Sequence, residues 1–195
     1  MFALVESESI TKTISSNRGV TIGDIQYPRN IFTLWSAEEK EAIGIYEIVH
    51  NNNNKRDEAF YTNTNVSYAF ADGVVTASYE SATAKSLADV TDEDDNVTLG
   101  LKSQKKEIIK QQASSLLTPT DWYVIKATDV ESYSVPSAIT TYRASVRTKS
   151  NEMEVLIEAC STVDELATLY EYVNTGTEEE PVMERPLGEF PTLEI

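Results

Sequence analysis

The chain has 195 residues and carries 32 acidic against 16 basic side chains, a formal net charge of −16 at pH 7. This charge repels phosphate backbones and anionic membranes, so it argues against nucleic-acid and membrane binding and favours a partner with basic patches. The sequence lacks both an apolar run of ~20 residues, as a membrane span requires, and a basic N-terminal region typical of a signal peptide. We therefore expect an intracellular protein.

Residues 1–80 predict a small β-rich module with one short helix. Ser36 followed three positions later by Glu39 is a capping box, which predicts a helix over residues 37–43. Gly44 is expected to end this helix, because glycine is common just beyond a helix C-terminus.

The strands of this module are indicated by alternating apolar residues. Asp72-Gly73 lies between the runs SYAFA and VVTASY, a strong signal for a tight β-hairpin. Further strands are expected at residues 2–5, 10–14 and 45–49.

Residues 81–100 are polar and contain the run DEDDN, which resembles a calcium loop. Counted from Asp92, however, the loop has Val97 where the sharp turn needs glycine and Ser103 where a bidentate glutamate is needed. We interpret the segment as an acidic linker.

One histidine and one cysteine, His50 and Cys160, are too few for a typical zinc site, so no metal or cofactor is expected.

Residues 101–175 predict a helical module. Pro136 suits the start of a helix, and Thr162 with Glu165 forms another capping box, for a helix that Gly176 would end. Three helices are therefore expected, over residues 101–117, from Pro136 to Cys160, and from Thr162 to Val173.

Between the first two helices lies the sequence TPTDW. Pro119 disfavours helix at the residue before it, and Thr120 or Asp121 can fix a turn through local hydrogen bonds. Trp122 would then be buried as a packing residue, with residues 123–125 extended beyond it. Its expected contacts are the two leucines at the end of the preceding helix, Leu116 and Leu117.

Residues 176–195 predict an extended acidic arm. Glutamates and three prolines argue against independent folding, yet several apolar residues argue against a simple solvated tail. The arm is expected to become ordered only on a neighbouring subunit or another copy of the chain, which leaves a homo-oligomer possible. Its expected anchors are Phe190, Leu193 and Ile195.

Arg143 and Arg147 are four positions apart and share one helix face. Two interpretations stay open: ion pairs with the protein's own carboxylates, or contact with an acidic patch on a partner.

Cys160 falls on the apolar face of its helix and is expected to be buried. Because the chain also lacks nucleophile-elbow, phosphate-loop and dinucleotide motifs, no enzymatic activity is expected.

Two short motifs resemble a known family. Leu116-Leu117-x-x-Thr120-Asp121-Trp122, then Pro136, then Tyr142-Arg143 with Val146-Arg147, resembles the LL..TDW and YR..LR signature of bacteriophage tail assembly chaperones and tail-fibre-assembly-like proteins. The similarity covers residues 103–150 well and the N-terminal part, including MFALVE, loosely.

The resemblance implies a non-catalytic phage protein that binds a tail or tail-fibre subunit. An assembly chaperone would act in the cytoplasm of the bacterial host. The alternative is a structural component retained in the virion tail or on its fibres. The chain departs from the pattern in two ways: Val146 replaces the usual leucine, and a third helix and acidic arm follow the arginine pair, where family members often end.

Overall fold

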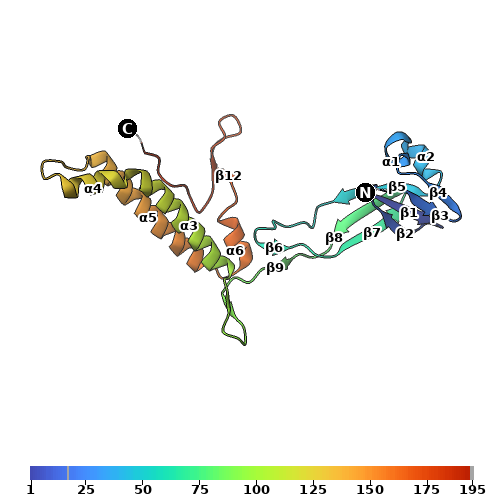
Figure 1. The fold of residues 1–195 in the computed structure, drawn as a ribbon, viewed down its shortest axis with the longest axis horizontal. Coiled ribbons are helices and arrows are strands. Elements are labelled where there is room, and N and C mark those ends of the chain that lie inside the picture. Colours follow the sequence, from blue (N-terminus) through green and yellow to red (C-terminus); the bar gives the residue numbers. More distant parts are fainter. Residues whose placement is uncertain (17, 194–195) are drawn as a thin grey trace. The chain divides into compact units, whose positions relative to one another are not determined.

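A computed structural model describes residues 1–16 and 18–193. These residues form two compact units, which divide between Thr83 and Ala84 (Figure 1). The first unit is built mainly from strands and the second mainly from helices, so the expected α+β class is confirmed. The division does not leave residues 84–100 as a linker, because they belong to the second unit.

A five-stranded mixed sheet forms the centre of the first unit. Its strand order is β2-β1-β5-β8-β7, and β5 pairs in parallel with β8 while the other neighbours are antiparallel. The strands are β1 (Phe2–Glu6), β2 (Ser9–Ile14), β5 (Ile45–Asn51), β7 (Val66–Ala71) and β8 (Val74–Tyr79).

The expected hairpin at Asp72-Gly73 is confirmed. Both residues have positive φ, 51° and 76°, as a two-residue turn matched to the strand twist requires. Glycine and aspartate tolerate this conformation better than most residues, which explains why the turn forms there.

Two short helices cover the sheet, where one was expected. Ser36 and Glu39 do form the capping box at the start of α2 (Ala37–Glu41), which ends earlier than predicted. The additional helix, α1 (Ile31–Leu34), buries Ile31 and Phe32. It was missed because four residues are too few to show helical periodicity. The core beneath the helices includes Phe2, Leu4, Ile14, Val20, Ile31, Phe32 and Ile45.

Short ladders complete the first unit. β3 (Val20–Ile22) and β4 (Ile25–Tyr27) form a hairpin. β6 (Tyr61–Thr62) is a two-residue strand, and β9 (Thr83–Ala84), also of two residues, spans the boundary between the units.

The second unit begins with a hairpin, β10 (Val90–Thr91) and β11 (Val97–Thr98). Asp89 connects it to the helix that follows, because its carboxylate accepts hydrogen bonds from the Gly100 amide and the Ser103 hydroxyl. The Asp92 carboxylate accepts from the Asp94 and Asn96 amides. The acidic run thus forms a folded turn, and the linker interpretation was wrong.

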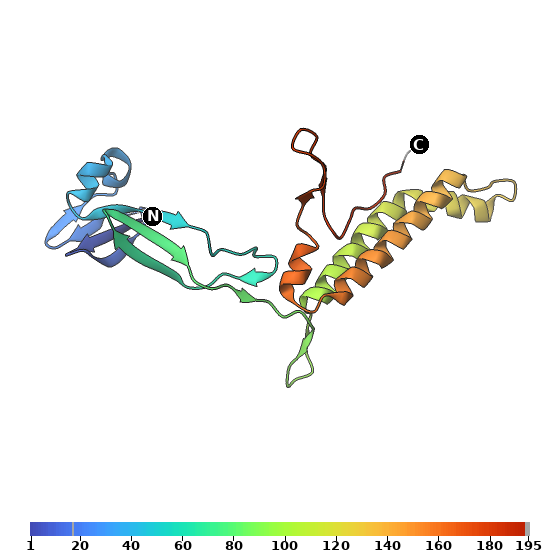
Figure 2. The same ribbon diagram turned by 180° about the vertical axis from the view of Figure 1, so that it is seen from behind.

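Two long antiparallel helices, α3 (Leu101–Leu117) and α5 (Ser137–Ala159), form the body of this unit (Figure 2). Between them the chain forms a 3-10 turn, η1 (Thr118–Thr120), and a further helix, α4 (Asp121–Asp129). The fully buried side chains include Ile109, Val146, Met153 and Ile157.

The chain ends with shorter elements. Thr162 caps α6 (Val163–Thr168) by accepting a hydrogen bond from the Glu165 amide, as expected. The helix stops well before Val173, however, because the chain turns into the hairpin of β12 (Val173–Asn174) and β13 (Met183–Glu184).

Candidate partner-binding surface

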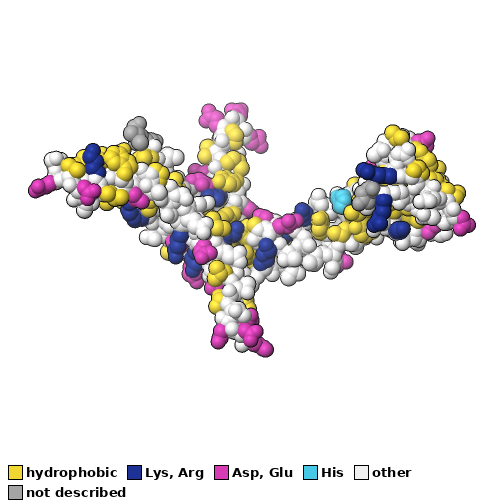
Figure 3. Space-filling view, viewed as in Figure 1, with side chains coloured by type: hydrophobic (Ala, Val, Ile, Leu, Met, Phe, Trp, Pro, Cys, Tyr) yellow, Lys and Arg dark blue, Asp and Glu magenta, His cyan; other side chains and the backbone are white. Residues whose placement is uncertain are grey.

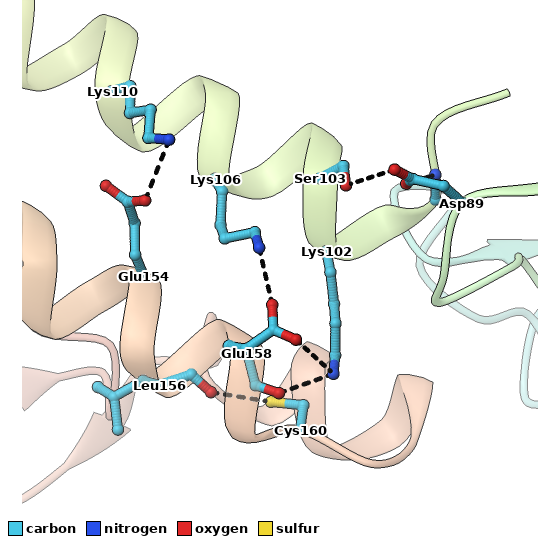
Figure 4. A network of polar contacts seen from close by, with 10 residues as sticks. Asp89, Lys102, Ser103, Lys106, Lys110, Glu154, Leu156, Glu158 and Cys160 are labelled. Carbon is cyan, nitrogen blue, oxygen red and sulfur yellow. Dashed lines mark hydrogen bonds and ion pairs between the residues drawn. The ribbon is translucent and has the colours of Figure 1, made fainter. Parts of the chain in front are cut away.

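A ladder of ion pairs holds α3 against α5 (Figure 4). Lys106 and Lys110 lie 2.7 and 3.3 Å from the carboxylates of Glu158 and Glu154, and Lys102 donates to the Glu158 carbonyl. The Lys106 hydrogen bond is the main cause that lowers the pKa of Glu158. Lysines four apart on α3 thus meet glutamates four apart on α5, so the pairs match the antiparallel register of the two helices.

At the other end of the helical pair, Arg143 connects α5 to the η1 turn. Its guanidinium donates to the Leu117 carbonyl, the Thr120 hydroxyl and the Asp121 carboxylate. The Arg143 side chain is only 12% exposed. The structure therefore brings the TDW and YR motifs together, and Arg143 is engaged by the protein's own groups.

The apolar members of the two motifs also meet. Tyr142 and Val146 on α5 form a buried cluster with Ala113 on α3, and the half-buried Leu116 and Leu117 pack against it. Pro136 occupies the N-cap position of α5. The apolar members of the motifs therefore support the junction, whereas Pro136 itself is exposed.

Trp122 is placed differently from the prediction. It is 50% exposed and lies in α4, so the expected role as a buried packing residue is wrong. Residues 123–125, expected to be extended, are helical. α3 ends at Leu117, as predicted, but Thr118 keeps helical backbone angles (φ −50°, ψ −46°), although Pro119 was expected to disfavour helix there. The chain continues into η1, whose first turn accommodates Pro119, and Asp121 then starts a new helix whose N-terminus favours an acidic side chain.

α4 therefore presents an aromatic surface to solvent. The rings of Trp122 and Tyr123 have centroids 3.9 Å apart, and Lys126 lies over the rings of Trp122 and Tyr133. Hydrophobic side chains are visible over this end of the helical pair in Figure 3. The amino-acid composition of α4 does not reveal that its aromatic side chains are exposed, because the same residue types are common in protein cores.

The C-terminal segment packs on its own unit. Leu187 is fully buried and its amide donates to the Leu169 carbonyl. Phe190 and Leu193 pack on the cluster around Tyr142. The expectation that this arm orders only on a neighbour was wrong, and these two anchors are occupied within the chain. Ile195 lies outside the described residues.

Two open grooves, each of about 650 Å³, flank this C-terminal segment. One runs along α5 and is lined by Ser145, Lys149 and Pro191. The other runs along α3 and is lined by Gln112 and Phe190. Both are shallow features of the same face, without a grouping of catalytic side chains.

Arg147 is exposed, and its guanidinium lies 3.4 Å from the Arg143 carbonyl. It forms no ion pair in the part of the chain that the structure describes. The two arginines, which share a helix face, thus differ in environment: Arg143 is fixed at the motif junction and Arg147 faces solvent.

Negative charge gathers at the tips of two hairpins in this unit (Figure 3). One tip carries the run Glu93 to Asp95 and the other carries Glu178 to Glu180. Within residues 1–16 and 18–193, no group of three His, Cys, Asp or Glu side chains could hold a metal ion.

Cys160 is buried where α5 ends, with its thiol 3.4 Å from the Leu156 carbonyl. Burial raises the pKa of this thiol, which favours the unreactive protonated form.

Across the described residues, the helices are all too short or too polar to cross a membrane.

Comparison with known proteins gives no further assignment: no family model, curated protein or solved structure matches this chain.

Proposed function

We propose that the protein is a non-catalytic phage tail protein of the tail assembly chaperone type, which binds a tail or tail-fibre subunit. The observation that carries this proposal is the meeting of the two motifs at Arg143. Residues 26 positions apart in sequence, Leu117 and Arg143, form one hydrogen-bonded junction. That junction supports a helix with an exposed aromatic surface, as a protein-binding role requires.

The location of the proposed partner site changes from the sequence-based expectation. Phe190, Leu193 and Arg143 are engaged within the chain. The exposed side chains of α4, together with Arg147, are free to contact a partner. The high negative charge also suits a factor that keeps an aggregation-prone subunit in solution.

A second candidate function is a structural virion component on the tail or its fibres. The C-terminal segment favours it, because its packing on the helical pair gives an ordered unit suited to permanent incorporation. Quantitative mass spectrometry of purified particles separates the two functions. Absence from particles supports the chaperone, and stoichiometric copies support the component. Failure to associate with tail or fibre subunits during infection contradicts both.

A further inference from the structure

α4 buries none of its nine residues. Helices of this length are marginally stable alone in water, and tertiary packing usually stabilises them. At its N-terminal end, Arg143 anchors Asp121 and so fixes where the helix starts. The apolar side chains beyond this anchor are 40–59% exposed; they are Trp122, Val124, Ile125 and Val130.

The aromatic side chains at this surface have defined positions. The rings of Trp122 and Tyr123 are in contact at an interplanar angle of 34°, and Lys126 lies 4.3 Å from the centroid of the Tyr133 ring. Rigid aromatic groups bind with little loss of conformational entropy, which is why tryptophan and tyrosine are frequent interface anchors. The surface is therefore organised before any partner arrives.

The charges around α4 indicate the chemistry of the partner. The Lys126 ammonium is placed over two aromatic rings, whereas Asp129 and Glu131 are exposed and form no ion pair among the described residues. The Lys126 ammonium keeps its charge in these contacts, but two carboxylates against one ammonium leave the charge beside the apolar surface net negative. A second copy of the chain would bring another −16 of net charge, which opposes self-association.

We propose that α4 and residues 130–133 form a docking surface for a basic amphipathic segment of another protein. The apolar face of the segment would cover Trp122 and Ile125, while its lysine or arginine side chains face Asp129 and Glu131. This inference rests on the proposed function in one respect: it takes binding of a protein partner to be the role of the second unit.

The test uses the full chain and three fluorescent helical peptides of equal length. The first is built from leucine and lysine, the second from leucine and glutamate, and the third from glutamine and lysine. Fluorescence anisotropy measures their binding. We expect the leucine–lysine peptide to bind about tenfold or more tightly than either of the others, because only it supplies both the apolar face and the positive charge. Equal binding of all three peptides, or no binding, overturns the proposal.

Two variants with matched controls locate the site. Trp122→Ser with Ile125→Ser should weaken binding about tenfold or more, whereas Val155→Ser, which changes a side chain 67% exposed on α5, should not. Asp129→Lys with Glu131→Lys should weaken binding more than Glu178→Lys with Glu179→Lys, which alters the net charge equally at a distant hairpin. Equal losses in the test and control variants overturn the proposal. Circular dichroism checks that each variant is folded.

Analytical ultracentrifugation tests whether a second copy of the chain binds at the α4 surface instead. A dimer that Trp122→Ser with Ile125→Ser disrupts would overturn the proposal in favour of self-association. A monomer supports it. The peptide result is also separable from the proposed function: peptide binding with no tail or fibre partner in infected cells would refute the phage role and leave the surface assignment intact.

Discussion

The guanidinium of Arg143 lies 2.7 Å from the carboxylate of Asp121, and the same group binds the carbonyl that ends α3. One side chain therefore fixes both the end of one helix and the start of the next. This arrangement gives the arginine a structural task that its solvent-facing neighbour on α5 does not share.

Arg143→Ala should lower the free energy of unfolding by about 2 kcal/mol, because hydrogen bonds to a charged donor are lost and a partly buried acceptor is left without it. Arg147→Ala should change it by less than about 0.5 kcal/mol, as is usual for exposed sites. Urea denaturation followed by circular dichroism compares them. Equal effects of the two substitutions would contradict the role assigned to Arg143.

Gly100→Ala should destabilise the second unit by about 1–3 kcal/mol, the usual cost of overpacking. A Cβ at this N-cap position would lie 2.3 Å from the backbone of Ala88, which cannot move away without disturbing the hairpin. Thermal unfolding of the helical signal measures the effect. Val97→Ala, at a nearby exposed side chain, is the control and should melt like the parent protein.

Hydrogen exchange should divide the C-terminal segment at Gly188. The Leu187 amide donates to the Leu169 carbonyl and should exchange slowly. Residues 189–193 form no backbone hydrogen bonds to the helices within the described chain, so the amides of residues 189, 190, 192 and 193 should exchange rapidly although Phe190 and Leu193 are half-buried. Strong protection of residues 189–193 in the free protein would contradict this prediction, because it would show that more than side-chain packing holds them.

Tyr170 should make stability fall at alkaline pH. Burial raises the pKa of its hydroxyl from 10.0 to about 12, so the unfolded chain loses this proton first as pH rises. Between these values the unfolded state binds fewer protons than the folded state, and the free energy of unfolding decreases with pH. Tyr170→Phe should remove this part of the decline in a series of thermal melts at increasing pH. An unchanged pH profile would exclude the contribution of Tyr170.

The local signals in the sequence were reliable where a few neighbouring residues determine the structure. The Ser36–Glu39 box and the Asp72-Gly73 turn depend only on short-range hydrogen bonds and backbone conformation, and both are found. Such features do not require knowledge of the tertiary fold.

Some errors are local, such as the missed helix α1 and the helical residues 123–125, which were expected to be extended. The larger errors concern tertiary placement. Trp122 was predicted to be buried because a large aromatic side chain usually is, but α4 projects it into solvent. The C-terminal segment was predicted to need a partner because of its glutamates and prolines. The cluster of Tyr142, Val146 and Ala113 that receives it comes from two other helices, and no pattern within the segment itself reveals it.

The parallel pairing of β5 with β8 has a consequence for how the chain acquires its structure. The β1–β2 and β7–β8 hairpins have local partners and can form early, but parallel strands cannot be joined by a tight turn. Here β5 can pair with β1 first, but its pairing with β8 must wait until the chain as far as Tyr79 is available. Non-local pairings of this kind slow folding. During synthesis, the sheet of the first unit is therefore completed late, when the β7–β8 hairpin docks on a preformed β1–β2–β5 edge.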